Sequence, residues 1–200
     1  MYTRVNAVRA APAVLLAALL VLPVPLASET ASEPRALSVW VESATGTVRM
    51  DDAAPASTAV WDGSTVRLSA ARGEHESFQV VLFSGIATTS ATLSLSPVSG
   101  PSTLPAGSVE FYQVFYIQPG YPSWPDPLVP LASPADLGWA AGQNEQVLVD
   151  IYVPRDAPPG QYFANITVES TQGTFVTPLV LTVWDITLPE KNTIQTWFDD

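Results

Sequence analysis

Apolar and polar residues alternate with a period of two along most of the chain after residue 37. Leu37, Val39 and Val41 point to one side of an extended chain, and the stretch Val66–Ala70 repeats the pattern. This period is typical of β-strands with one buried and one wet face. Beyond the N-terminal segment, no window of 11 or more residues shows helical spacing, and the 19 prolines disfavour long helices. The pattern therefore predicts an all-β protein.

Eight segments carry this pattern, and clusters of Gly, Pro, Asn or Asp that favour turns separate them. The expected strands lie near residues 37–41, 66–70, 76–84, 91–96, 109–117, 145–153, 162–169 and 175–188. Eight or nine short strands in a chain of this size predict an antiparallel two-sheet β-sandwich of the immunoglobulin-like type. A closed barrel is the alternative.

The first 28 residues have the pattern of a secretory signal peptide. Arg4 and Arg9 give a basic start, and the apolar run Ala13–Leu22 follows. A membrane-spanning helix needs ~20 apolar residues, and this run has about half that length. We therefore expect cleavage near residue 28 and a secreted or extracytoplasmic chain without a membrane span after cleavage.

The expected domain organisation follows from these two patterns. Residues 29–36 are small, polar and bounded by proline, which indicates a flexible leader. The sandwich is expected over residues 37–189. Residues 190–200 are expected to be either the start of a downstream domain or an edge segment of the sandwich, since Ile194, Trp197 and Phe198 have no obvious partner in a completed sandwich.

The chain is strongly acidic and contains no cysteine. Its formal net charge is −11, and without the signal peptide it has six basic and 19 acidic residues and a charge of −13. Nucleic acid is not an expected partner, because phosphate binding needs a basic surface. The lack of cysteine excludes thiol chemistry and thiolate metal sites, and we expect no cofactor.

One segment is unusual in this alternating chain. Pro119–Leu131 places five prolines among Tyr121, Trp124 and Asp126, which predicts a stiff aromatic loop. Rigid aromatic rings suit both sugar binding and domain interfaces, because little conformational entropy is lost on contact. Three roles remain open for it: docking of a neighbouring domain, contact with a glycan in which Trp139 also takes part, or capping of the sandwich core.

Four separated stretches resemble the N-terminal domain of glycoside hydrolase family 123 and its relatives of unknown function. They are VWDGSTVRLSAARGEHESFQVVL (residues 60–82), YPSWPDPLVPL (121–131), AGQNEQVLVDIYVPRDAPPGQY (141–162) and LTVWDITLPEK (181–191). The resemblance implies a β-sandwich that precedes a (β/α)₈-type catalytic barrel, which removes N-acetylgalactosamine from glycans by substrate-assisted chemistry. It places the catalytic acidic pair in the barrel, whereas this chain stops at Asp200, about where the barrel would begin.

The resemblance therefore implies a non-catalytic accessory domain that supports a downstream barrel in cis. The alternative is a free-standing carbohydrate-binding or cell-surface adhesion module. A third and less favoured possibility is a hydrolase within these 200 residues, for which the sequence offers no catalytic constellation.

Acidic residues are plentiful, but none is set in a pattern that specifies a catalytic or metal site. The candidates are Glu74, Glu76, Asp126, Asp136, Glu145, Asp150 and Asp156. In the cluster Glu74-His75-Glu76, a strand would place the two carboxylates on one face and the imidazole on the other. We therefore expect these three residues not to converge.

Asn165-Ile166-Thr167 is an N-glycosylation sequon. It is relevant only in a host that glycosylates secreted proteins, and a chance triplet on a strand is an equal interpretation.

Overall fold

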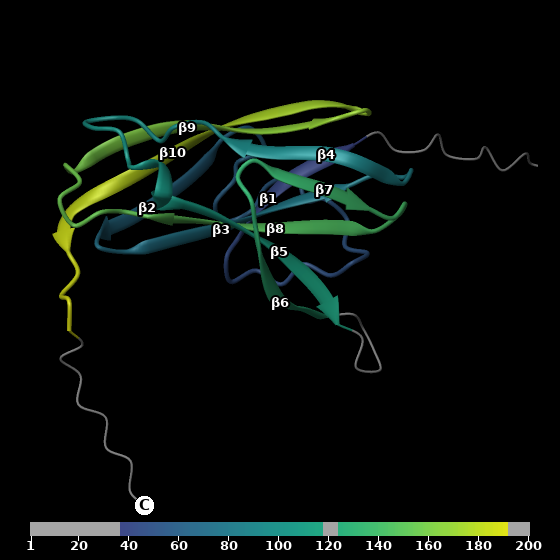
Figure 1. Ribbon diagram of the computed structural model, residues 1–200, viewed down its shortest axis with the longest axis horizontal. Helices are drawn as coiled ribbons and strands as arrows, with labels where there is room; N and C mark the ends of the chain where they lie inside the picture. Colours follow the sequence, from purple (N-terminus) through teal and green to yellow (C-terminus); the bar gives the residue numbers. More distant parts are fainter. Residues whose placement is uncertain (1–36, 118–123, 192–200) are drawn as a thin grey trace, which may run out of the picture. The chain divides into compact units, whose positions relative to one another are not determined.

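The structure is a computed structural model that describes residues 37–117 and 124–191 (Figure 1). The expected signal peptide, the leader, Tyr121 and residues 192–200 lie outside the described residues. Within the described ranges, no helix is long and apolar enough to cross a membrane.

The described residues form ten strands and one short 3₁₀-helix. The strands are β1 (Ser38–Ser43), β2 (Val66–Arg72), β3 (His75–Phe83), β4 (Thr88–Leu95), β5 (Val109–Ile117), β6 (Trp124–Leu131), β7 (Ala135–Trp139), β8 (Asn144–Tyr152), β9 (Gly160–Ser170) and β10 (Gly173–Thr187), and the 3₁₀-helix η1 (Ala106–Ser108) precedes β5. All eight expected strands are present, with ends that differ by a few residues. Two strands, β6 and β7, were not expected from the sequence.

The strands pack as two five-stranded sheets, which confirms the all-β sandwich (Figure 1). The first sheet has the order β1-β3-β8-β5-β6, and the second has the order β2-β10-β9-β4-β7. One pairing differs from the expected antiparallel arrangement, because β10 runs parallel to β2. The turn between β2 and β3 carries the chain from the second sheet to the first. It depends on Gly73, whose φ of 81° is costly for other residues.

The space between the sheets is filled by alternate residues of both. Phe78 and Val80 on β3, Val149 on β8, and Leu179 and Leu181 on β10 are each buried to 1% exposure or less. Trp40 and Trp61 are also buried, so both indoles belong to the packed interior. Each Å² of apolar surface removed from water stabilises the fold by about 25 cal/mol, so this layer is the main source of stability.

The proline-rich segment is the main correction to the sequence-based prediction. Residues Trp124–Leu131 form the edge strand β6, paired antiparallel with β5, and not a loop. Pro125, Pro127 and Pro130 lie within this strand. Proline is tolerated at a sheet edge because no further strand needs its N–H, and it discourages pairing with another chain. The prolines therefore have a structural use as protection of an open edge.

The β5–β6 hairpin extends past the edge of the second sheet (Figure 1). Every residue of β6 is exposed or half-buried. On the hairpin, Phe115, Ile117, Trp124, Leu128 and Val129 are exposed apolar side chains. Buried and exposed positions do not alternate along β6, and its pairing with β5 shifts register between Val114 and Tyr116.

Two phenylalanines on the first sheet allow a direct test of the core. Phe78→Ala is expected to lower the free energy of unfolding by about 3–5 kcal/mol, because it leaves a cavity between the sheets. Phe115→Ala is the matched control: its side chain is 44% exposed, so a loss under about 1 kcal/mol is expected. Urea denaturation of both variants measures the difference, and equal losses would contradict the assignment of the core.

Candidate functional site

The structure places the expected aromatic-site residues in different parts of the fold. Trp124 and Asp126 lie two residues apart on β6, and Asp126 falls in the register shift of the β5–β6 pairing. The side chain of Trp124 is 42% exposed, and Asp126 is also exposed. Tyr121 lies outside the described residues.

Trp139 does not join an exposed aromatic surface. It ends β7 in the second sheet, where it pairs with Thr88, and it is 7% exposed. Buried and exposed residues alternate along β7, and Trp139 lies on the buried face. The expectation that Trp139 contacts a glycan together with Trp124 is therefore wrong.

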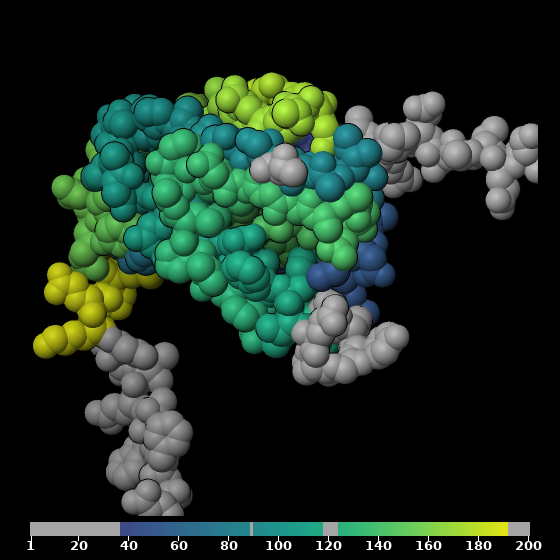
Figure 2. All heavy atoms as spheres, turned by 45° about the vertical axis from the view of Figure 1, so that its right-hand side comes forward, coloured from purple at the N-terminus to yellow at the C-terminus, as the bar shows by residue number. Residues whose placement is uncertain are grey.

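Trp124 has a neighbour that the sequence did not indicate. The guanidinium carbon of Arg49 lies 5.3 Å from the centre of its ring, which is within the range of a cation–π interaction. Arg49 belongs to the segment between β1 and β2, and in Figure 2 the blue residues of this segment lie beside the teal hairpin. One face of the indole therefore has a guanidinium against it, which supplies hydrogen-bond donors next to an exposed ring.

Three buried carboxamides hold this segment on the outer face of the first sheet. Gln79 Nε2 donates to the carbonyls of Ser43 and Gly46, each at 2.7 Å. Asn144 Nδ2 donates to the carbonyls of Arg49 and Asp52, at 2.8 and 2.9 Å. Since the backbone of Arg49 is fixed in this way, its position over Trp124 is a consequence of β3 and β8.

Gln146 completes this set of amides. Its Nε2 donates to the carbonyl of Val48 at 2.6 Å and also to the hydroxyl of Tyr116. Burial raises the pKa of Tyr116 to about 12, so its hydroxyl stays protonated.

A second candidate site lies at the opposite end of the first sheet. His75 at the start of β3 and Asp150 on β8 are joined by a 2.6 Å contact between Nδ1 and Oδ2. Ser77 Oγ donates to the other carboxylate oxygen of Asp150 at 2.5 Å. The ring of Tyr152 lies against His75, with 4.8 Å between ring centres.

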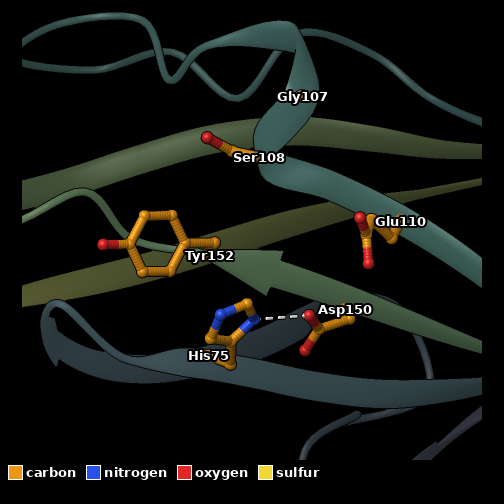
Figure 3. A pocket seen from close by; sticks show the side chains of 6 residues that line it. All are labelled: His75, Gly107, Ser108, Glu110, Asp150 and Tyr152. Atoms are coloured by element: carbon orange, nitrogen blue, oxygen red, sulfur yellow. Dashed lines mark hydrogen bonds and ion pairs between the residues drawn. The ribbon is translucent and has the colours of Figure 1, made fainter.

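These residues surround a hollow of about 160 Å³, which His75, Gly107, Ser108, Glu110, Asp150 and Tyr152 line (Figure 3). They come from β3, η1, β5 and β8, which lie side by side at this end of the sheet. The carboxylate of Glu110 points toward Asp150, and Ser108 lies above the Tyr152 ring (Figure 3). The hollow was not expected, because its residues are spread over about 75 positions of sequence.

The expectation that Glu74, His75 and Glu76 do not converge is consistent with this geometry. Glu74 accepts a hydrogen bond from the backbone N–H of Ala71 at 2.6 Å and so stabilises the β2–β3 turn. Burial raises the pKa of Glu76, and the charges of Glu74 and Asp150 raise it further. His75 instead turns to Asp150 on the neighbouring strand. Among the described residues, no group of three or more His, Asp or Glu side chains is placed to hold a metal ion.

The His75–Asp150 pair has the arrangement of an oriented base. In the described residues, however, no hydroxyl is hydrogen-bonded to Nε2 of His75. The pair therefore shapes a polar hollow and does not by itself form a complete catalytic constellation.

Glu145 is a buried carboxyl that the sequence did not single out as special. Its Oε1 accepts a hydrogen bond from Gln113 Nε2 at 2.7 Å. Burial raises the pKa of Glu145 to about 7, although the bond from Gln113 opposes the shift.

The C-terminal end of β10 and the residue that follows it carry a second exposed apolar group, in addition to that of the β5–β6 hairpin. Trp184, Ile186 and Leu188 are 48%, 58% and 37% exposed, respectively. The segment is fixed to the body of the sandwich, because Arg72 forms an ion pair with Asp185 at 2.8 Å. The backbone N–H of Leu188 also donates to the carbonyl of Arg72 at 2.8 Å.

The sequon residue Asn165 lies on β9 of the second sheet and is exposed. Its backbone pairs with Pro178 on β10, so the side chain stands on the outer face of this sheet. It remains an expected glycosylation site only for hosts with that machinery.

No protein-family model matches the chain, and no curated protein matches it. Among solved structures, the chain is similar to a family 123 glycoside hydrolase from Clostridium perfringens, with a TM-score of 0.62 and 16% identity over 76% of this chain and 28% of that chain. The chain thus has the fold of part of that hydrolase and spans 28% of its length.

Two further sandwich structures match less well. The PapD-like domain 7 of human CEP192 gives a TM-score of 0.35 and 14% identity over 84% of this chain and 99% of that domain. An immunoglobulin domain complex of titin M10 and obscurin-like 1 gives a TM-score of 0.26 and 13% identity over 59% of this chain and 85% of that one.

The buried Glu145 gives a pH-dependent prediction. The ordinary pKa of a glutamate side chain is 4.5, whereas the pKa of Glu145 in the folded chain is about 7. Between these two pH values, Glu145 loses its proton in the unfolded chain and keeps it in the folded chain. Stability therefore falls as the pH rises through this window. Glu145→Gln is expected to remove that fall and to be more stable than the parent by roughly 1–3 kcal/mol above the window, since each pKa unit is worth about 1.4 kcal/mol.

Urea denaturation across the window measures this effect. Glu169→Gln, on the exposed side of β9, is the control and should change stability by less than about 0.5 kcal/mol at every pH. A Glu145→Gln profile parallel to that of the parent would rule out the buried, proton-retaining carboxyl.

Proposed function

We propose that the chain is a non-catalytic accessory domain of a secreted glycoside hydrolase, which supports or positions a catalytic barrel on a glycan substrate. The single observation that carries this proposal is the fold similarity of 76% of the chain to part of a family 123 glycoside hydrolase. The four sequence stretches that resemble the N-terminal domain of that family support the same assignment.

The exposed end of β10 gives this role a physical basis. Trp184, Ile186 and Leu188 lie immediately before the residues that lead out of the sandwich. Exposed apolar groups of this kind mark contact surfaces. Arg72 and Arg155 tie this segment to the sandwich through Asp185 and the carbonyl of Leu188. An apolar surface on a segment that is tied to the sandwich suits a domain that contacts and orients a neighbour.

Secretion is part of the proposal and rests on the N-terminal sequence pattern alone. Expression with the native N-terminus in a host with a secretion pathway, followed by N-terminal sequencing of the exported chain, tests it. A mature start close to residue 28 is expected, and an uncleaved or retained chain would contradict it.

Carbohydrate binding by the sandwich itself is a second candidate function. The observation that favours it is the exposed Trp124 with the Arg49 guanidinium on its ring and the exposed Asp126 two residues further along β6. An aromatic face beside hydrogen-bond donors and acceptors is a suitable surface for a sugar.

The support role is tested by reading the gene beyond the codon for Asp200. We expect the frame to continue into about 250 or more residues of alternating strands and helices, the pattern of a (β/α)₈ barrel. In that longer protein, Trp184→Ala should lower the melting temperature by about 2–4 °C more than in the 200-residue chain, because an interface contact is lost as well.

Val176→Ala is the control for this comparison. Val176 lies on the same strand and is 54% exposed, so its effect should be the same in the longer and the shorter protein. A stop codon directly after Asp200, or equal effects of Trp184→Ala in both proteins, would contradict the support role.

Glycan binding is tested on the 200-residue chain itself with an immobilised glycan array. If the second candidate is correct, the chain binds a subset of glycans, and Trp124→Ala weakens that binding by about ten-fold or more, as expected for an aromatic contact worth 1.4 kcal/mol. Leu128→Ala, which removes an exposed apolar side chain from the same strand, is the control. Absence of binding, or binding that survives Trp124→Ala, excludes this candidate.

A further inference from the structure

We propose that the hollow at the end of β3, β5 and β8 is a binding site for a single polyhydroxylated ring, such as one monosaccharide unit. This site is separate from Trp124 and from the end of β10, and it does not depend on the proposed support role. It is assigned from the polar atoms that line the hollow and from the two aromatic rings at its wall (Figure 3).

The hydrogen bonds around Asp150 fix the orientation of His75. A carboxylate accepts hydrogen bonds, so the proton in the 2.6 Å contact belongs to Nδ1 of His75. The other oxygen of Asp150 accepts from Ser77. In the neutral imidazole, Nε2 is then an acceptor, and within the described residues it has no hydrogen-bond partner.

Three other polar atoms at the hollow are equally free within the described part of the chain. Glu110 uses Oε2 to accept a bond from Tyr112, which leaves Oε1 available. The hydroxyls of Ser108 and Tyr152 make no side-chain hydrogen bond there. The hollow therefore offers two acceptors, at His75 and Glu110, and two hydroxyls that can donate or accept.

The combination of acceptors and hydroxyls at the hollow favours some classes of ligand over others. An anion is disfavoured by the carboxylates of Glu110 and Asp150 and by the strongly acidic chain. A metal ion is disfavoured because both oxygens of Asp150 are already engaged by Ser77 and His75. An alkylammonium ion only donates, so it would satisfy the acceptors at His75 and Glu110 but would offer no acceptor to the hydroxyl protons of Ser108 and Tyr152. A ligand with several hydroxyl groups suits both kinds of atom, since each hydroxyl both donates and accepts.

The size and walls of the hollow point to one ring. Its volume of about 160 Å³ is below the ~300–1,000 Å³ of sites for larger ligands. Tyr152 and His75 provide two adjacent aromatic rings inclined at 38°, and an aromatic face packs well against the apolar C–H face of a sugar ring. An open hollow of this size is expected to bind weakly, with a dissociation constant of about 1 mM or above.

The test uses the fact that His75 is the only histidine in the chain. The 200-residue protein is prepared without a histidine tag and labelled with ¹⁵N, so that every imidazole signal reports on the hollow. D-glucose, D-galactose and D-mannose are titrated separately, with glycerol, ethylammonium chloride and calcium chloride as probes of the competing chemistries. We expect at least one hexose to shift the Nε2 signal of His75 in a saturable manner, with smaller, non-saturable effects of the other three.

Substitutions then locate the binding. Glu110→Gln and Tyr152→Leu are expected to weaken the hexose titration at least ten-fold, whereas Glu169→Gln on the second sheet is expected to leave it unchanged. Tyr152→Phe keeps the ring and removes only the hydroxyl, so it should weaken binding less than Tyr152→Leu and serves as the second variant if Tyr152→Leu does not fold.

The proposal is overturned if no hexose gives a saturable shift, or if glycerol does so equally well. It is also overturned if ethylammonium or calcium saturates the signal in place of a hexose, or if Glu110→Gln binds as the parent does. A failed titration leaves the support role intact, because that role is decided by the gene beyond Asp200 and by Trp184.

Discussion

The period-two alternation of strand β8 is the constraint on which the rest of the first sheet depends. Val147, Val149 and Ile151 point inward and are at most 1% exposed, so they fix the strand in the core. The residues between them must then point outward. A shift of one residue in the pairing of β8 would bury the polar set and expose the valines, so the core also determines the register of every outward-facing group.

Those outward-facing groups organise two separate surfaces. Near the start of β8, Asn144 and Gln146 hold the segment that carries Arg49 against the sheet. Near its end, Asp150 and Tyr152 orient His75 and line the hollow. The buried amide nitrogens bond to backbone carbonyls, which offsets part of the cost of removing polar groups from water, whereas Oδ1 of Asn144 and Oε1 of Gln146 have no hydrogen-bond partner among the described residues. One strand thus connects the packing of the sandwich with both the Arg49–Trp124 contact and the polar hollow.

The edge strands meet a different requirement, because their unpaired backbone groups must be kept from pairing with another chain. The β5–β6 hairpin lies beyond the cover of the second sheet, and β6 has an open side. The prolines of β6 reduce the number of donors that another chain could pair with. The same segment nevertheless exposes Trp124, Leu128 and Val129, so this edge discourages strand pairing while it leaves an apolar surface. The end of β10, held by Arg72, provides a second such surface on the other sheet.

The sequence alone determined the fold class and the positions of eight strands, because burial between two sheets imposes a period that is visible residue by residue. It also predicted that His75 does not converge with Glu74 and Glu76, because alternate residues of a strand point to opposite faces. It did not identify β6, since prolines argue against a strand unless that strand is known to lie at an edge, and this position is set by pairing with distant β5. The contact of His75 with Asp150, the position of Arg49 over Trp124 and the burial of Glu145 were likewise decided only by the tertiary structure. Each joins or surrounds groups from segments that are distant in the sequence, and local spacing does not indicate which segments become neighbours.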